Sequence, residues 1–241
     1  TGPAFFVIAD PSLYAKSGAP VSVIASPAEA ASVFPKALPV LDVGIGVRAH
    51  AGKAEAGNAK AVVASIERAV DFVLKGAAES IVTNPIQKSA LIADGFPFPG
   101  HTEFLEALTE KAPMPAGRRR GAVMMIAGPE LRTVPLTIHV SVRDAASMIT
   151  KEMICEKAMI VIEALRFDFG IHPARLAMSG LNPHAGEDGA MGAEDRDIIA
   201  PAVKLLRENS GAQVRGPLPA DTMFHAAARK TYDAALCMLH D

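Results

Sequence analysis

Three histidines, His139, His184 and His240, each follow an apolar stretch that is typical of a buried strand. In an open α/β sheet, the carboxyl ends of the strands form the edge at which ligands bind. The neutral imidazole ring is the side-chain group that most often ligates a catalytic divalent metal. The sequence therefore favours a three-histidine metal site at one edge of a sheet.

A simpler interpretation is that these histidines are unrelated and that each is hydrogen-bonded locally near a strand end. The chain contains seven histidines, and histidine is a residue of intermediate burial that suits such positions. No compact motif such as His-Glu-x-x-His joins the three. The residues alone leave both interpretations open.

The composition is that of a globular protein, because half of the 241 residues are hydrophobic, 21% are charged and the formal net charge is −2. This charge gives no reason to expect nucleic acid or an anionic membrane as a partner. No apolar run is long enough to span a bilayer, and the first residues do not resemble a signal peptide. The two cysteines form neither a disulfide framework nor a Cys-x-x-Cys pair. We therefore expect a soluble protein of the reducing cytoplasm.

Short apolar runs alternate with longer helical patterns, which is typical of βαβ units and predicts an α/β fold. The predicted strands are Ala4–Ala9, Val21–Ala25, Val40–Val43, Ser80–Thr83, Ala122–Ala127, Leu136–Val140, Arg175–Ser179 and Ala234–Leu239. The three histidines lie at or just after the ends of three of these runs. If the strands are parallel neighbours, the fold brings the histidines to one edge.

Three segments have the apolar spacing of amphipathic helices: Ala59–Lys75, Thr150–Gly170 and Glu194–Asn209. Thr150 is a plausible N-cap. Asp195 lies in the predicted first turn of the third helix, where negative charge suits the helix dipole. Neither Gly-x-Gly-x-x-Gly nor Gly-x-x-x-x-Gly-Lys-[Ser/Thr] occurs, so a dinucleotide must be bound in another way.

Several short motifs occur in a distinctive order along the chain. They are residues 83–88 (TNPIQK), 96–105 (FPFPGHTEFL), 128–132 (GPELR), 181–187 (LNPHAGE), 216–222 (GPLPADT) and 238–241 (MLHD). In this combination the chain resembles the 4-hydroxythreonine-4-phosphate dehydrogenase family of pyridoxal phosphate biosynthesis. The resemblance covers almost the whole chain.

The resemblance implies a fold like that of isocitrate and isopropylmalate dehydrogenases, with no Rossmann fingerprint. In that fold, residues 1–241 form a single catalytic unit of two interleaved α/β subdomains in an α/β/α arrangement. Family members also have a strand and a Gly/Pro-rich loop before the position of Thr1, and a further segment after Asp241. We therefore expect both parts of the family pattern to be missing from the chain as printed.

The resemblance also implies a reaction, the NAD- or NADP-dependent oxidation of 4-phosphooxy-L-threonine to 2-amino-3-oxo-4-phosphooxybutanoate. This product decarboxylates to 3-amino-2-oxopropyl phosphate. By the same resemblance, His139, His184 and His240 bind one divalent cation, which is Zn²⁺, Mg²⁺ or Co²⁺. The site is expected at the subunit interface of a homodimer, with ligands from both subunits.

His101 and Thr102 match the family's substrate-binding pair. The alternative for Thr102, on local sequence, is that it caps the N-terminus of a helix. We interpret Lys88 as a solvated loop lysine, although it could reach phosphate or cofactor.

Asp221 and Asp241 are the carboxylates closest in sequence to the histidine segments. Either could orient an imidazole ligand or accept the proton of the substrate hydroxyl. We assign the catalytic role to Asp241. The alternative for Asp221 is that it caps the helix that follows it.

Two other functions are compatible with these residues. A close relative of the family oxidises phosphorylated threonate or erythronate in sugar-acid catabolism, and its substrate carries a hydroxyl group in place of the amine. The second alternative is a catalytically silent scaffold that keeps the fold. The three intact histidines argue against the scaffold.

Overall fold

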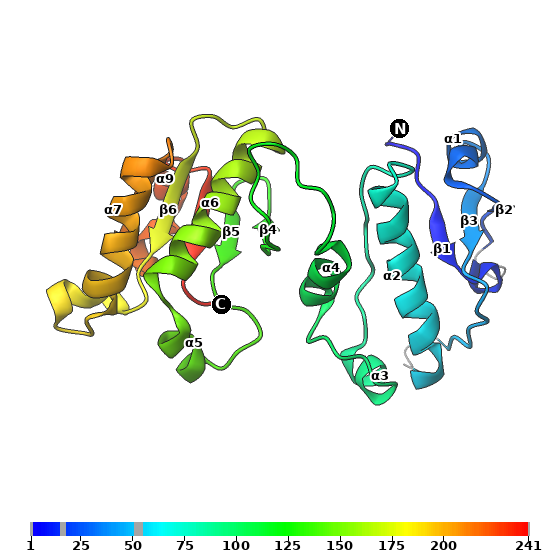
Figure 1. Cartoon of the computed structure of the whole chain (residues 1–241), viewed down its shortest axis with the longest axis horizontal. Coiled ribbons are helices and arrows are strands. Elements are labelled where there is room, and N and C mark those ends of the chain that lie inside the picture. The colour runs from blue at the N-terminus through cyan, green and yellow to red at the C-terminus, as the bar shows by residue number, and fades with distance from the viewer. Residues whose placement is uncertain (1, 15–17, 51–54, 241) are drawn as a thin grey trace. The chain divides into compact units, whose positions relative to one another are not determined.

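The computed structural model describes residues 2–14, 18–50 and 55–240 of the chain (Figure 1). It divides into two compact units, Thr1–Ala112 and Pro113–Asp241, each continuous in sequence. Both units combine helices with parallel strands, which confirms the predicted α/β class. The single catalytic unit with interleaved subdomains stays a prediction. No helix among the described residues has the length and apolar character needed to cross a membrane.

The first unit contains a small parallel sheet with strand order β1-β3-β2. Its strands are β1 (Val7–Ala9), β2 (Val21–Ile24) and β3 (Leu38–Asp42). Its helices are α1 (Ala30–Val33), α2 (Ala59–Leu74), α3 (Lys88–Ala93) and α4 (His101–Thr109). The three strands confirm the first three predicted runs with shifted ends.

Helix α2 confirms the amphipathic pattern expected for residues 59–75. Its apolar stripe buries Ile66 and Val70, which are one turn apart. Phe72 joins the small core of the first unit, and its ring meets Phe6 edge to face at a centroid distance of 5.9 Å. Gly76 adopts a φ of +70° just after the helix, a backbone conformation that favours glycine at this position.

The second unit contains a larger sheet with strand order β4-β5-β8-β6-β7. Strand β4 runs antiparallel to β5, and the other neighbouring strands are parallel. The strands are β4 (Ile126–Ala127), β5 (Arg132–Pro135), β6 (Arg175–Ser179), β7 (Gln213–Leu218) and β8 (Ala234–Cys237). The helices are α5 (Val142–Met148), α6 (Lys151–Phe167), α7 (Ala200–Asn209), α8 (Ala220–Met223) and α9 (Ala226–Arg229).

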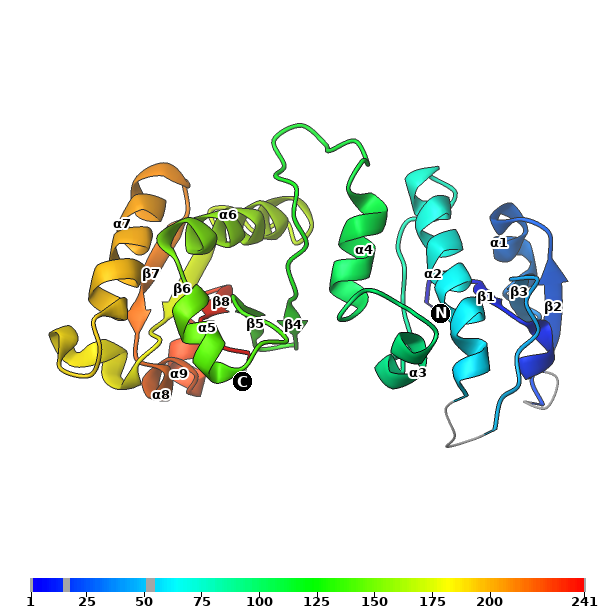
Figure 2. The same cartoon turned by 60° about the horizontal axis from the view of Figure 1, so that its bottom comes forward.

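Helices cover both faces of this larger sheet. Alternate residues of β6 point to opposite faces, so Leu176 and Met178 join the main core while Ala177 joins a smaller cluster. Buried residues of α6 and α7 complete the main core, and Met223 of α8 packs in the smaller cluster. Figure 2 shows α6 and α7 along one face and α8 on the other. The sheet is therefore the middle layer of the second unit.

Two further sequence predictions hold in this unit. Strand β6 has the predicted bounds, Arg175–Ser179. Helix α6 begins at Lys151, and the Thr150 side chain accepts a hydrogen bond from the backbone N–H of Met153 at 3.2 Å, as expected of an N-cap. A π-helical turn, Asp195–Ile199, leads into α7, and the two together cover nearly all of the third predicted helix.

The strand predicted over Leu136–Val140 is wrong, because β5 ends at Pro135. The actual strand was missed because it begins with two polar residues, Arg132 and Thr133. In the fold, the Arg132 guanidinium stacks on the Phe169 ring, 5.0 Å from its centre. Such stacking lets a charged side chain cover apolar surface. Leu136 is still fully buried just beyond the strand.

Other strand predictions fail for different reasons. Ser80–Thr83 forms no strand, and Val82 is 96% exposed. β-branched residues favour extended backbone, but a strand also needs a hydrogen-bonded neighbour. Within the predicted Ala122–Ala127, β4 includes Ile126 and Ala127 alone. Strand β7 was not predicted because Gly216 and Pro217 interrupt its pattern, which an edge strand tolerates.

Asp233 links the amino ends of β8 and β6. Its carboxylate accepts hydrogen bonds from the backbone N–H of Arg175 at 2.8 Å and from the Arg175 guanidinium at 2.6 Å. Burial raises the pKa of Asp233, but the hydrogen bonds from Arg175 outweigh it and leave the pKa below its ordinary value. The ionised carboxylate is therefore the form that the fold favours.

We expect Asp233→Asn to lower the free energy of unfolding by about 1–2 kcal/mol at pH 7, with solvent screening of the half-exposed Arg175 included. A group with a lowered pKa in the folded state stabilises the fold above its unfolded pKa of about 3.9, and this contribution is lost as the pH falls through the lowered value. Urea unfolding at a series of pH values measures the effect. Asp71→Asn is the control, because Asp71 forms an exposed pair with Lys75 on α2. Equal losses in the two variants would contradict the prediction.

Candidate active site

The three histidines follow three adjacent strands of the larger sheet at their carboxyl ends. His139 follows β5, His240 follows β8 and His184 follows β6, and these strands are parallel neighbours in the order β5-β8-β6. Asp221 follows β7, the next strand. The fold thus brings all four residues to the edge where parallel α/β sheets bind ligands.

Hydrogen bonds beyond the strands hold these ends together. The backbone N–H of Leu136 donates to the carbonyl of Cys237 at 2.7 Å, and the Thr137 hydroxyl donates to the carbonyl of Met238 at 2.8 Å. The backbone N–H of Met238 donates in turn to the Ser179 hydroxyl at 3.1 Å. Thr137 and Ser179 are both buried. The segments that lead to the three histidines are therefore joined to one another.

His139 and His240 lie close together at this edge. Their ring centres are 6.5 Å apart and the ring planes differ by 30°. His139 has a φ of +54°, a left-handed conformation that is uncommon for residues other than glycine. Such backbone persists where the surroundings enforce it, and it concentrates at functional sites.

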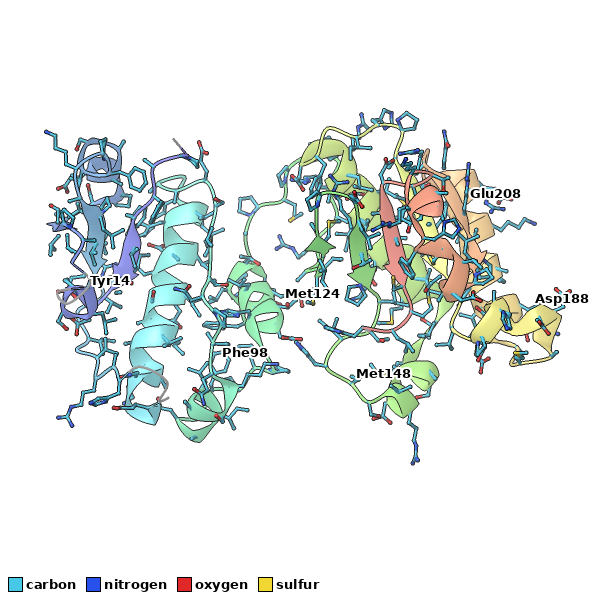
Figure 3. All side chains as sticks on the ribbon, turned by 180° about the vertical axis from the view of Figure 1, so that it is seen from behind. Tyr14, Phe98, Met124, Met148, Asp188 and Glu208 are labelled. Atoms are coloured by element: carbon cyan, nitrogen blue, oxygen red, sulfur yellow. The ribbon has the colours of Figure 1, made fainter. Side chains whose placement is uncertain are left out.

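His184 lies in a loop, Pro183–Gly189, that we name the His184 loop. Five consecutive residues of this loop, 184–188, have φ values between +41° and +79°. Left-handed backbone costs about 1–2 kcal/mol for each residue other than glycine, so contacts with the rest of the unit must hold the loop. Asp188 is labelled in Figure 3 within this loop.

The His184 ring faces Asp221. Its Nδ1 atom lies 3.7 Å from the nearer carboxylate oxygen, and both side chains are more than half exposed. An exposed pair at this distance contributes little to stability. Asp221 lies inside the first turn of α8, whose N-cap is Pro219, so the interpretation of Asp221 as a helix cap is wrong.

The donor set suits a divalent cation, because neutral imidazoles are common ligands of Zn²⁺ and related metals. As placed in residues 2–14, 18–50 and 55–240, however, no three His, Cys, Asp or Glu side chains form a group that could hold a metal ion. The three-histidine site therefore stays a prediction, based on residue type and strand position. Asp241, the predicted catalytic carboxylate, lies outside the described residues.

The predicted substrate-binding residues lie in the first unit, at the start of α4. Gly100 is the N-cap of this helix, and His101 and Thr102 are its first two residues. The interpretation of Thr102 as the helix cap is therefore wrong. The Nε2 atom of His101 is buried and has no hydrogen-bond partner among the residues that the structure describes. A buried polar atom without a partner is costly and points to a ligand that completes it.

Burial lowers the pKa of His101, and the nearby positive charge of Lys88 lowers it further. The ring is therefore neutral near pH 7, with one nitrogen able to donate and the other able to accept a hydrogen bond. Lys88 is exposed as predicted, but it begins helix α3 and does not lie in a loop. Its charge acts on His101, so this position combines a neutral imidazole with a nearby cation.

We expect a nuclear magnetic resonance titration to give His101 a pKa below its ordinary value of about 6.5. Lys88→Met should raise this pKa only in part, because burial is the larger cause. As the pH falls below about 6.5, the unfolded chain takes up a proton that folded His101 resists, so the free energy of unfolding decreases. A His101 pKa at or above the ordinary value, or full recovery in Lys88→Met, would refute this account.

Sequence reasoning missed the residue that anchors the His184 loop. Asp195 was interpreted as a first-turn charge that suits a helix dipole, but the residue is only 1% exposed and its carboxylate accepts hydrogen bonds from residues 181–182. Its neighbours Glu194, Arg196 and Asp197 are charged as well, so nothing in the local sequence set Asp195 apart. The signal available in the sequence was the group of small residues Gly180, Gly186 and Gly192 around the loop.

The second unit is thus a parallel α/β structure with histidine- and carboxylate-bearing loops at its carboxyl edge, an arrangement typical of enzymes that bind small molecules. Residues 3–241 match the family described as pyridoxal phosphate biosynthetic protein PdxA. The chain belongs to this family, which confirms the resemblance of its motifs.

Individual relatives agree with this assignment. A 4-hydroxythreonine-4-phosphate dehydrogenase of Bradyrhizobium diazoefficiens is 49% identical, over 99% of this chain and 72% of that protein. One of Caulobacter vibrioides is 48% identical, over 100% of this chain and 72% of that protein. The crystal structure of a 4-hydroxythreonine-4-phosphate dehydrogenase from Burkholderia phymatum superposes with a TM-score of 0.77 at 32% identity, over 98% of this chain and 71% of that one.

Proposed function

We propose that this protein is an oxidoreductase that converts 4-phosphooxy-L-threonine to 2-amino-3-oxo-4-phosphooxybutanoate, which then decarboxylates to 3-amino-2-oxopropyl phosphate. Membership of the PdxA family and the names of the relatives support the reaction. The single structural observation that carries the proposal is the placement of His139, His184 and His240 after three adjacent parallel strands.

His139, His184 and His240 hold a divalent cation, Zn²⁺, Mg²⁺ or Co²⁺, through their imidazole nitrogens. When bound, this cation supplies positive charge that lowers the pKa of the substrate hydroxyl and stabilises negative charge on its oxygen. Asp221, which faces His184, orients that ring, as carboxylates commonly do for histidine ligands.

The other assigned residues bind the substrate and accept its proton. His101 uses its neutral, buried Nε2 atom to hydrogen-bond the substrate, and Thr102 contributes its hydroxyl. Asp241 accepts the proton of the oxidised hydroxyl. The hydride requires an acceptor, which NAD or NADP provides when bound.

The finer architecture also belongs to this proposal. We expect a two-subdomain arrangement like that of isocitrate dehydrogenase, in a homodimer whose interface lies at the active site. Support for the interface comes from the exposed apolar side chains that follow His139, namely Val140, Val142 and Met148. Met148 is labelled in Figure 3 at the end of α5. Cys155 and Cys237 are free, which fits the cytoplasm.

NADH or NADPH formation tests the function directly. The protein is stripped of metal, resupplied with Zn²⁺, Mg²⁺ or Co²⁺, and assayed with 4-phosphooxy-L-threonine and 4-phosphothreonate side by side. Metal-dependent turnover of the amino substrate is the expected result. Preference for the threonate would assign the protein to sugar-acid catabolism, and no turnover of either substrate would favour the scaffold.

A further inference from the structure

The carboxylate of Asp195 is buried, and the residues that lead into the His184 loop donate hydrogen bonds to it. It accepts hydrogen bonds from the backbone N–H of Leu181 at 2.9 Å and from that of Asn182 at 3.0 Å. The side-chain amide of Asn182 donates a third at 2.9 Å. These donors belong to the residues that lead from β6 into the His184 loop.

Two glycines let the backbone pass close to this carboxylate. A Cβ atom added to Gly180 would lie 2.7 Å from one carboxylate oxygen of Asp195. One added to Gly186, within the loop, would lie 3.4 Å from the other oxygen. The carboxylate therefore touches the chain both before and inside the His184 loop.

A second acidic residue reinforces this anchor. Glu194 accepts a hydrogen bond from the Asn182 side chain at 2.8 Å, and this contact contributes to lowering the pKa of Glu194, after a larger contribution from its own backbone. Asn182 thus donates to two neighbouring carboxylates. The backbone N–H of Ala185, inside the loop, donates to the carbonyl of Asn182 at 3.1 Å, so Asn182 also contacts the loop directly.

We propose that Asp195 is a positioning residue for His184. By fixing the backbone at Leu181 and Asn182, it holds the left-handed His184 loop in the one conformation that presents the imidazole at the carboxyl edge of the sheet. Asp195 itself touches neither cation nor substrate. The part of this inference that concerns the cation rests on the proposed function, whereas the part that concerns the loop does not.

The test compares Asp195→Asn with the matched control Asp197→Asn. The first change keeps the size of the side chain but places an amide nitrogen against N–H donors, so at least one of the three hydrogen bonds is lost. Asp197 lies two residues further on, is exposed and forms an ion pair with Arg196. Both variants and the unchanged protein are compared by Co²⁺ titration, hydrogen exchange and thermal unfolding.

We expect Asp195→Asn to weaken Co²⁺ binding about 10- to 100-fold, the range found when a group that orients a metal ligand is removed. Amide hydrogen exchange should accelerate at residues 183–189 while protection of β6 is kept. Asp197→Asn should match the unchanged protein in Co²⁺ affinity and in hydrogen exchange, and thermal unfolding shows that both variants are folded at the temperature of these measurements.

Two results would overturn the inference. The first is unchanged exchange at residues 183–189 in Asp195→Asn, because the carboxylate then does not hold the loop. The second is unchanged Co²⁺ affinity in Asp195→Asn despite faster exchange in the loop, because the anchor then does not position His184. If the unchanged protein binds no Co²⁺ at all, the proposed metal site fails, and hydrogen exchange alone still decides whether Asp195 fixes the loop.

Discussion

His184→Ala is expected to abolish NAD(P)H formation. It should also weaken cation binding by more than the 10- to 100-fold that is typical when a residue that hydrogen-bonds to a metal ligand is removed. The reason is that one of three imidazole donors disappears from the carboxyl edge of the sheet. The fold should survive, because the His184 side chain is more than half exposed and its 3.7 Å contact with Asp221 contributes little to stability. Co²⁺ titration, the rate of NAD(P)H formation and thermal unfolding measure the three effects.

His172→Ala provides the matched control. His172 is an exposed histidine that precedes β6, so it lies at the opposite end of the strand that leads to His184. Its loss should leave cation binding and oxidation unchanged. If His184→Ala keeps normal activity, or if both variants lose it equally, the three-histidine site is wrong.

The elements with strong local signals could be predicted from the sequence. The apolar spacing of α2, the N-cap at Thr150 and the apolar run of β6 each depend on residues close together in the chain. Strand β5 was misplaced because Arg132 is made compatible with a buried strand by Phe169, which is far away in sequence. Sequence patterns fail where a distant contact decides the local structure.

The same distinction applies to the candidate site. His139, His184 and His240 could be placed at one edge from the sequence, because each follows an apolar run and parallel strands align their carboxyl ends. The left-handed backbone of the His184 loop could not be predicted, because it depends on the carboxylate of Asp195, a residue that looks like an ordinary first-turn acid. Burial of that carboxylate is visible only in the folded chain.

Gly216→Ala is expected to lower the free energy of unfolding by about 2–6 kcal/mol, the combined effect of a strained backbone and an overfilled contact. Gly216 has a φ of +147°, and a Cβ atom there would lie 2.7 Å from the backbone carbonyl oxygen of Met178 on β6. Backbone cannot move aside as the end of a flexible side chain can. The strands β6 and β7 must therefore separate at the ends that lead to His184 and Asp221.

Gly211→Ala separates the two causes. Gly211 also has a positive φ, +69°, but a Cβ atom there would meet nothing within 4 Å. Only the backbone conformation is then unfavourable, at a cost of about 1–2 kcal/mol. Urea unfolding of both variants measures the difference, and Co²⁺ titration of folded Gly216→Ala should show weaker binding than in Gly211→Ala. Equal free energies of unfolding in the two variants would mean that β6 and β7 can move apart at Gly216 without loss of stability. Their close approach would then not fix the spacing of His184 and Asp221.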